Sequence, residues 1–489
     1  MAKIPEEIKR HRLRGTEIKK VGNRYYIQRV KCVWVPETKT RRKVVLEYIG
    51  AVTPEGIEPR RKRVVRAGAE PHSKEFGATW ALRELSADVR EHLARHFGEE
   101  AGWIYAAALL RCVHPCAMRY LEHRYETSWL SEALPGLDMR SGSLSAAMKR
   151  LGARRGAIAA FMREFVPSGD WYAIFDGTSM VCNSRNIGEA QRGYNASGCR
   201  DPQVNLMYAL ALREEGIAPV FYKRYPGSIR DVSAFRNMAN EMGLSTALVI
   251  ADKGITKKEE CRRLEESGLA YVMPLQRSSA QYSRAPLEAP GRTGFAGRFK
   301  YNGRIIWHSE ERPSPDSPHK LCLYLDENLH HAEATSRLTA DIGRETPEAL
   351  QEAARRQLQY GTFVLRTNLL ESTPEAVYRA YKTREEIEQL FDMYKCEGQM
   401  ATTGMHSSQT QEACLFINHL CVMLAYRLHA RLRKNGRLKE YAVQKTLEHF
   451  LRDIRASRYG DSDWQFEPVP KVSRLAMEAI ELTLPQIPS

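Results

Sequence analysis

One segment carries acidic, basic and phenolic side chains at a spacing that suits chemistry on a phosphodiester. It reads YKTREEIEQLFDMYK and runs from Tyr381 to Lys395. A helix turns about 100° per residue, so four side chains would fall within roughly 60° of one another: Tyr381, Arg384, Glu388 and Lys395. A carboxylate flanked by two cations and a phenol suits a metal ion and a phosphate. An amphipathic surface helix with a solvated charged face would show the same pattern.

Helical geometry alone does not select one acid of this segment. Its acids are Glu385, Glu386, Glu388 and Asp392. Glu388 is placed between Arg384 and Lys395, one and two turns away, which would keep its carboxylate ionised. A capping box formed by Thr383 and Glu386 is a second possibility, and it would break the helix just after Tyr381.

Two further carboxylates follow apolar runs upstream. Asp176 ends the run in WYAIFDG, and Asp252 ends the run in TALVIADKG. Short apolar runs with β-branched or aromatic residues predict buried strands. An aspartate at the carboxyl end of such a strand, followed closely by glycine, is a rigid mount for a metal or a substrate. Aspartate is also an ordinary turn former.

The elements around these aspartates have a recognisable order. The sequence predicts strands at Val204–Leu212 and Pro219–Arg224, a helix at Asp231–Met242, a helix at Lys257–Ser267 and a strand at Leu269–Leu275. With the two aspartate strands, the order is three strands, a helix, a strand, a helix and a strand. That is the order of the ribonuclease-H-like fold, in which the first and fourth strands are adjacent. Asp176 and Asp252 would then lie together.

These residues resemble a known family. The chain is similar to DDE transposases of prokaryotic insertion sequences, in the group marked by a Tyr–(2)–Arg–(3)–Glu–(6)–Lys signature, the insertion-sequence-four superfamily. Tyr381, Arg384, Glu388 and Lys395 match it at every position. RGYN (192–195) and PGSIRD (226–231) resemble segments that the family carries between its two aspartates. The chain departs at Ser228, where relatives more often have asparagine.

The resemblance implies the chemistry. Asp176, Asp252 and Glu388 would be catalytic and would hold two magnesium ions, for which manganese could substitute. Tyr381, Arg384 and Lys395 would grip phosphates around the scissile bond. The implied activity is cut-and-paste transposition, with DNA cleavage and strand transfer at the ends of an insertion sequence. The implied partners are double-stranded DNA, namely terminal inverted repeats and target DNA, and a second copy of the chain as a homodimer.

A long insertion separates the second and third acids. Asp252 and Glu388 are 136 residues apart, far more than one helix and one strand require. Within residues 276–372, RFKY and RIIW flank Asn302-Gly303, a strong hairpin signal. We therefore expect a mainly β insertion. Trp307 ends this hairpin and could stack on a base, as relatives with such insertions do, or it could simply pack.

The basic charge is concentrated at the amino terminus. Residues 1–70 contain 19 Lys and Arg against eight Glu and no Asp, a net +11 of the formal +15 for the chain. Basic residues interleaved with aromatic, strand-like segments indicate phosphate binding. The DNA-binding candidates here are Arg41, Arg42, Lys43, Arg60, Arg61, Lys62 and Arg63. A solvated basic arm would also imply an anionic partner. No helix-turn-helix signature identifies a recognition helix.

The predicted fold is α/β, a ribonuclease-H-like core interrupted by the insertion. The expected regions are a basic β-rich DNA-binding module (1–70), a helical DNA-binding or linker region (71–165), the first part of the core (166–275), the insertion (276–372), the second part of the core (373–433) and a helical carboxyl-terminal region (434–489).

Several other classes of protein are not supported. The most apolar stretch, 413–426, is interrupted by Asn418 and His419, so no membrane span is predicted. The amino terminus lacks an apolar signal core, and we expect a cytoplasmic protein with reduced thiols. Cys112 and Cys116 have no second pair at zinc-site spacing. No small-molecule cofactor is expected.

Two alternatives remain. A ribonuclease-H-like nuclease without strand transfer would lack a separate end-binding domain, and the basic module argues against it. A domesticated, catalytically inactive DNA-binding protein would not need a complete acid triad and signature.

Overall fold

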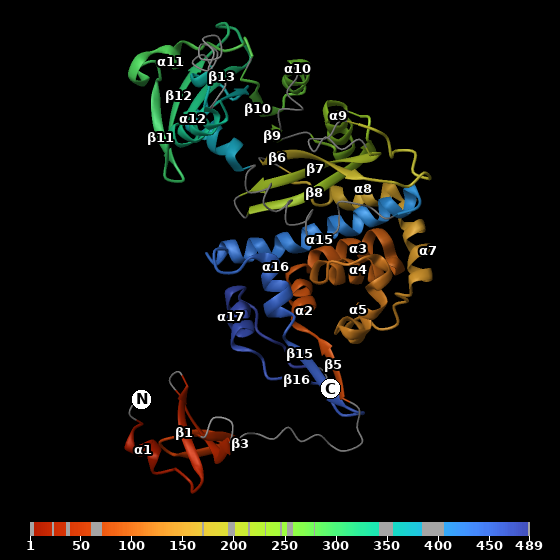
Figure 1. Ribbon diagram of the computed structural model, residues 1–489. Coiled ribbons are helices and arrows are strands. Elements are labelled where there is room, and N and C mark those ends of the chain that lie inside the picture. Colours follow the sequence, from red (N-terminus) through yellow and green to blue (C-terminus); the bar gives the residue numbers. More distant parts are fainter. Residues whose placement is uncertain are drawn as a thin grey trace. The chain divides into compact units, whose positions relative to one another are not determined.

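The chain is a mixed α/β protein in a computed structural model (Figure 1). The structure describes residues 4–21, 24–35, 40–59, 71–168, 171–193, 201–213, 216–229, 231–244, 247–251, 258–277, 279–341, 356–383 and 405–487. Two compact units, Met1–Pro71 and His72–Ser489, make up the chain.

The amino-terminal unit is built on a small antiparallel sheet. Its elements are α1 (Glu6–Lys9), β1 (Thr16–Val21), β2 (Arg24–Val35), β3 (Thr40–Thr53) and β4 (Gly56–Pro59), and the strands lie in the order β1-β2-β3-β4. The core of this unit is small and consists of Ile8, Ile18, Ile27 and Val52. The basic, strand-like segments of the amino-terminal sequence form β2 and β3.

The larger unit contains a nine-stranded sheet, and five of its strands lie in the segment predicted as the first part of the core. They are β6 (Tyr172–Val181), β7 (Gln203–Arg213), β8 (Gly216–Pro226), β9 (Leu248–Ala251) and β10 (Ala270–Leu275). Their order is β8-β7-β6-β9-β10. The first three are antiparallel, and β9 is parallel to both β6 and β10. The predicted adjacency of the first and fourth strands is confirmed.

Helices cover both faces of this part of the sheet. On one face lies α9 (Asp231–Met242), whose Phe235 ring is 4.7 Å from that of Phe175 on β6. On the other lie α8 (Arg155–Arg163) and the long helix α15 (Ser408–Lys434), as Figure 1 shows. The helix α10 (Lys258–Glu266) connects β9 to β10. Burial on both faces explains why β6 and β7 read as nearly continuous apolar runs.

The insertion continues the same sheet. Its strands are β11 (Gly297–Tyr301), β12 (Arg304–Glu311), β13 (Lys320–Asp326) and β14 (Thr362–Thr367), and its helical elements are α11 (Ala285–Glu288), η3 (Pro290–Arg292) and α12 (Glu327–Asp341). The strand β14 pairs antiparallel with β10 and so covers an edge that would otherwise be open. The predicted hairpin is confirmed: β11 pairs with β12, and Asn302 and Gly303 have φ of 46° and 80°.

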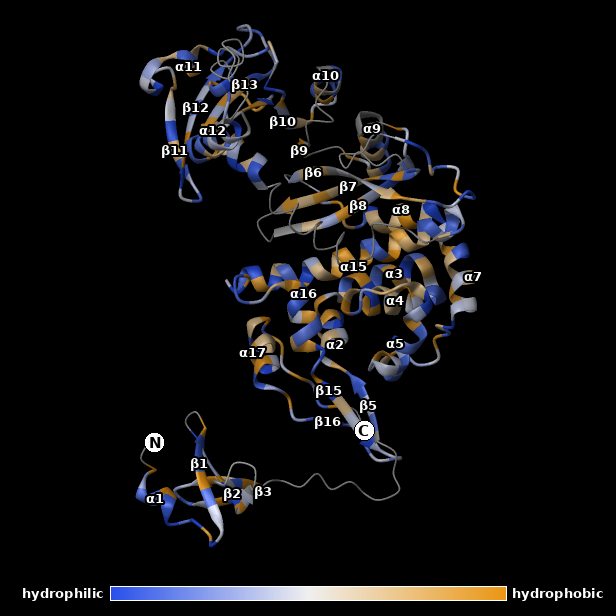
Figure 2. Cartoon of the chain, in the orientation of Figure 1, coloured by the Kyte–Doolittle hydropathy of each residue, from blue (hydrophilic) through white to orange (hydrophobic). Residues whose placement is uncertain are grey.

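A helical layer precedes the core, as the sequence predicts. It comprises α2 (Gly77–Leu85), α3 (Ala87–Phe97), η1 (Gly98–Glu100), α4 (Ala101–Val113), η2 (Met118–Tyr120), α5 (Leu121–Thr127), α6 (Leu130–Ala133), α7 (Ser141–Gly152) and α8. The helix α15 packs against α4, α7 and β8. Hydrophobic residues gather where these helices meet (Figure 2).

The carboxyl-terminal region, which the sequence predicts to be helical, is helical only in part. After α16 (Val443–Lys445) and the π-helical turn η4 (Thr446–Leu451), the chain forms β15 (Arg455–Tyr459) and β16 (Gln465–Phe466), then α17 (Lys471–Ala479). The strand β15 lies between β16 and β5 (Pro71–Glu75) in a three-stranded sheet. The pairing of β15 with β5 joins segments almost 400 residues apart in the sequence, so no local sequence pattern predicts it.

By length and composition alone, α15 could cross a membrane. However, 83% of its most apolar 18-residue window is buried within the protein. It is the central core helix of the larger unit.

Candidate active site

Asp176 lies on the central strand of the core. Its neighbours Ile174 and Phe175 are fully buried, so β6 is held firmly by the apolar layers on its two faces. The backbone of Asp176 is paired with Tyr208 on β7. A residue in this place inherits the rigidity of the sheet.

The parallel pairing of β6 and β9 extends to the residue that precedes the second aspartate, Asp252. Tyr172 is opposite Leu248, and the paired residues continue to Phe175 opposite Ala251. Asp176 follows Phe175, and Asp252 follows Ala251 in the sequence. Asp252 itself lies outside the described residues. The two strands therefore run together up to the residue before each aspartate.

The segment that leads into the signature is a helix over residues 374–383. Its Tyr378 is fully buried, with its ring 5.1 Å from those of Phe299 on β11 and Tyr324 on β13. Tyr381 is partly buried, and its ring lies 6.0 Å from that of Phe363 on β14. The helix is thus anchored on the insertion strands. Arg384, Glu388 and Lys395 lie outside the described residues.

This helix also continues past Tyr381, the first residue of the signature. The Thr383 hydroxyl donates to the Ala380 carbonyl at 2.5 Å, within a helix already under way at residue 374. The helix is therefore not broken directly after Tyr381, and Glu386, the second member of the capping-box alternative, lies outside the described residues. A hydroxyl bonded back to the preceding turn is the bond of a residue inside a helix.

A buried charged network fixes α15 beneath the core strands. Glu412 is 5% exposed and accepts hydrogen bonds of 2.9 Å from Arg155 Nη1 on α8 and from the Tyr222 hydroxyl on β8. Arg224 Nε lies 3.4 Å from its second carboxylate oxygen. Removing one member of such a network leaves the others buried without their partner, at a cost of about 3–5 kcal/mol. The sequence analysis did not predict this network. A single glutamate, Glu412, near the start of an otherwise apolar helix could have indicated it.

His419, on the same helix, is not suited to proton transfer. It is fully buried, and burial lowers its pKa to about 3, with Arg155 adding to the effect. It therefore stays neutral at every physiological pH.

The two loop segments that resemble family motifs meet at Gly193 and Gly227, where a Cβ on Gly193 would lie 1.9 Å from the Gly227 carbonyl oxygen. Gly227 N donates to the Glu189 carbonyl at 3.1 Å, and Asn205 Nδ2 donates to the Gly227 carbonyl at the same distance. The Ser228 hydroxyl donates to the side-chain oxygen of Gln191. Ser228, the position of departure from the family pattern, is thus a loop contact. Of RGYN, residues 194 and 195 lie outside the described residues.

These loops tolerate no side chain at Gly227. A Cβ there would lie 2.2 Å from the Gln203 carbonyl oxygen and 2.3 Å from that of Gln191. We expect Gly227→Ala to destabilise the protein by about 1–3 kcal/mol, because backbone must move to admit the methyl group. Gly188→Ala in the same loop region, where a Cβ meets nothing within 4 Å, is the matched control. Thermal unfolding followed by circular dichroism compares them, and equal melting temperatures would contradict the packing described here.

Trp307 lies on β12 in the insertion. Its ring is partly buried against a cluster that includes Leu321 and Leu323, and it lies 6.2 Å from the Phe295 ring. The Arg298 guanidinium lies 5.1 Å above the Trp307 ring. The ring thus has packing contacts of its own in the insertion. Base stacking by Trp307 stays a prediction.

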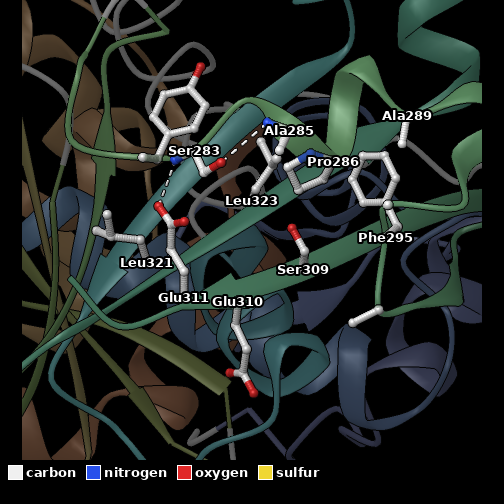
Figure 3. Close-up of a pocket in the computed structure, with 13 residues that line it drawn as sticks. Ser283, Ala285, Pro286, Ala289, Phe295, Ser309, Glu310, Glu311, Leu321 and Leu323 are labelled. Atoms are coloured by element: carbon white, nitrogen blue, oxygen red, sulfur yellow. Dashed lines mark hydrogen bonds between the residues drawn. The ribbon is translucent and has the colours of Figure 1, made fainter. Parts of the chain in front are cut away.

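The insertion also contains a cavity of about 550 Å³ between the α11 segment and strands β12 and β13 (Figure 3). Phe295, Leu321 and Leu323 form part of its apolar wall. Glu311 accepts a 2.7 Å hydrogen bond from Ser283 N at its margin, and Glu310 is paired with Lys320 at 2.8 Å. Two carboxylates make the cavity a poor site for phosphate. It contains none of the predicted catalytic residues.

The basic candidates of the amino-terminal unit lie partly in the described region. Arg41 and Lys43 are exposed on β3, and Lys43 Nζ lies 2.9 Å from a Glu17 carboxylate oxygen. Arg42 lies between them on the same strand, opposite Val33. Arg60, Arg61, Lys62 and Arg63 lie outside the described residues.

Possible metal ligands can likewise be located only among the described residues. In the parts of the chain that the structure describes, no group of three or more His, Cys, Asp or Glu side chains could hold a metal ion. Of the three predicted ligands, only the backbone of Asp176 belongs to those parts. Cys112 and Cys116 form no disulfide with another described cysteine.

Similarity to known proteins exists at the level of a sequence family and of solved structures. No curated protein matches the chain. A cryo-EM structure of the piggyBac transposase synaptic complex with hairpin DNA is similar at 10% sequence identity, over 78% of this chain and 81% of that one, with a TM-score of 0.40. The sequence model described as "Transposase DDE domain" matches residues 167–424, more than half of the chain, and spans the sheet that carries Asp176. The chain therefore belongs to the family of transposases with a DDE domain.

Proposed function

We propose that this protein is a cut-and-paste transposase of the Tyr-Arg-Glu-Lys signature group, with a ribonuclease-H-like catalytic core. The observation that carries the proposal is the register of β6 and β9, which run side by side up to Phe175 and Ala251, the residues that precede Asp176 and Asp252. One more step in that register would place the two aspartates opposite each other. The strand order β8-β7-β6-β9-β10 supports the ribonuclease-H-like assignment.

We assign the catalytic site to Asp176, Asp252 and Glu388. Their donor set fits magnesium, because three carboxylates supply the hard oxygen ligands that this ion prefers. Magnesium bound there would supply charge stabilisation at the phosphodiester under attack. Manganese, also an oxygen-preferring ion, is the expected substitute.

The signature residues would position the DNA. Tyr381 is held by the contact of its ring with Phe363 on β14. Arg384 and Lys395 would bind phosphate oxygens, which arginine can do in a bidentate manner. Cleavage and strand transfer need the scissile phosphate held in line with the attacking oxygen, and these cations would fix it there.

The rest of the chain would hold the DNA ends. We assign duplex binding to residues 1–70, with the helical region 71–165 as linker or second contact. The insertion (276–372) would support the catalytic helix, and the core would continue through 373–433. Residues 434–489 would pack on the core or contact a second copy in a homodimeric DNA complex. A cytoplasmic location fits these roles.

The test uses purified full-length protein and a duplex that carries the terminal repeat flanking its gene. With magnesium, a transposase cuts at the repeat boundary and then joins the freed 3′-hydroxyl end to a second duplex, which gives branched products on a denaturing gel. Cutting without joining favours the nuclease alternative. Duplex binding without cutting in magnesium or manganese favours the inactive DNA-binding alternative.

The division of labour predicts a distinct salt dependence. Deletion of residues 1–70 leaves β5 and its sheet in place, since β5 begins at Pro71. We expect the truncated protein to lose most affinity for the terminal repeat, together with a large part of the slope of log affinity against log salt. Each phosphate contact contributes about 0.9 to that slope. Fluorescence anisotropy over a salt series measures it, and an unchanged slope would place the DNA-binding surface elsewhere.

A further inference from the structure

The distal halves of β2 and β3 form a two-stranded ribbon with both edges open. The strand β1 pairs with β2 only over Arg24–Arg29, and β4 pairs with β3 only over Gly50–Thr53. Beyond these pairings lie residues 30–35 and 40–46, in which Val30–Val35 pair with Thr40–Val45. We call these residues the ribbon. At the base, Val30 N also donates to the Gly15 carbonyl at 3.1 Å. Register shifts at Ile27/Gln28 and Arg29/Val30 mark irregularities at its base, where bulges increase strand twist.

The ribbon exposes large apolar side chains that do not belong to the core of this unit. The exposed fractions are 43% for Val33, 56% for Trp34, 40% for Val44, 52% for Val45 and 58% for Leu46. The core of this unit lies entirely below the ribbon, around Ile27 and Val52. Open strand edges with exposed apolar residues favour association with another molecule, and proteins that keep them have a use for them.

Basic residues stand directly across the ribbon from apolar ones. Trp34 is opposite Arg41, and Val44 is opposite Lys31. The ribbon contains four basic residues and no acidic one: Lys31, Arg41, Arg42 and Lys43. Within the described part of the chain, neither Lys31 nor Arg41 has an ion pair. This surface thus combines positive charge with apolar contact area on one narrow element.

We propose that the ribbon inserts into a groove of duplex DNA and reads the sequence of the element's ends. Strands about 4.8 Å apart make a ribbon narrow enough for the major groove, about 12 Å wide, which admits a two-stranded β-ribbon. Six residues per strand span about 20 Å, enough for several base pairs. Arginine and lysine recognise guanine edges, and apolar side chains recognise thymine methyl groups. The proposal rests on the proposed transposase function and supplies its recognition element.

The charge pattern favours DNA over a second copy of the chain. The buried centre of a protein interface is depleted in charged residues, lysine among them. The ribbon instead alternates basic and apolar residues across its width. Two copies would bring Lys31 and Arg41 of both ribbons together, and the ribbon itself contains no acidic residue to neutralise them.

The test starts from a pool of duplexes with 20 randomised base pairs, from which full-length wild-type protein selects its binders. Trp34→Ala and Arg41→Gln remove the apolar and the basic member of one cross-strand pair. We expect each to lower affinity for the selected duplex about tenfold or more, as the loss of a base contact does, and to change affinity for the unselected pool much less. Lys19→Gln, an exposed lysine on β1 outside the ribbon, is the matched charge control and should lower both affinities equally.

Each other outcome overturns the proposal in a distinguishable way. If the variants keep the wild-type affinity and select the same sequences, recognition lies elsewhere, while the transposase function stands. If Trp34→Ala converts a dimer into a monomer in light scattering and leaves DNA affinity unchanged, the ribbon binds a second copy. If the wild-type protein selects and binds no duplex, both the ribbon proposal and the transposase function fail.

Discussion

Asp176→Asn should reduce magnesium-dependent cleavage of a terminal-repeat duplex by at least about a thousandfold. The substitution keeps the shape of the side chain and removes the charge that the proposed site needs, and losses of several powers of ten are the expected scale for such a change. Asp252→Asn should have the same effect, because the two strands would present both carboxylates to the same site. Binding of the duplex should stay near normal, since the amino-terminal unit is proposed to hold it.

The control for this experiment is Asp316→Asn. Asp316 is an exposed aspartate in a loop of the insertion, and the substitution removes the same charge from another place. It should leave cleavage unchanged. If Asp176→Asn or Asp252→Asn still nicked the duplex at more than about a hundredth of the wild-type rate, the assignment of that acid would be wrong.

The second large effect is expected on the signature helix. Glu388→Gln should be inactive with magnesium or manganese, because it removes the third carboxylate of the proposed site. Glu386→Gln should be nearly normal, since Glu386 points away from the face shared by Tyr381 and Glu388 if the helix of residues 374–383 continues. Glu385 and Asp392 would lie on the same broad face of the helix as Tyr381, so Glu385→Gln and Asp392→Asn should be impaired but active.

Parallel cleavage assays on these four variants separate the alternatives. Each variant is first shown to be folded by circular dichroism and to bind the duplex. An active Glu388→Gln, or an inactive Glu385→Gln beside it, would mean that another acid completes the site.

Local sequence patterns predicted the elements of the core well. The apolar runs before Asp176 and Asp252 are β6 and β9, and the Asn302-Gly303 turn joins β11 and β12 as expected. These features depend on neighbours in the sequence, such as turn chemistry and continuous burial. The adjacency of β6 and β9 followed from the order of the elements and not from any single pattern.

Contacts between distant segments could not be predicted in this way. The strand β15 reads RASRY, with one buried residue, so it lacks the alternation of a typical half-buried strand. The attachment of β14 to β10 depends on an open edge that exists only in the folded sheet. The buried Glu412 forms ion pairs with Arg155 on α8 and Arg224 on β8, and these partners are distant in the sequence.

The central claim is that Asp176 and Asp252, with Glu388, form one metal site. Crystals of the full-length protein grown with manganese and a terminal-repeat duplex test it directly through anomalous scattering. We predict manganese peaks in contact with the carboxylates of both Asp176 and Asp252. Strong manganese peaks on other residues, with these two carboxylates apart and free of metal, would contradict the account.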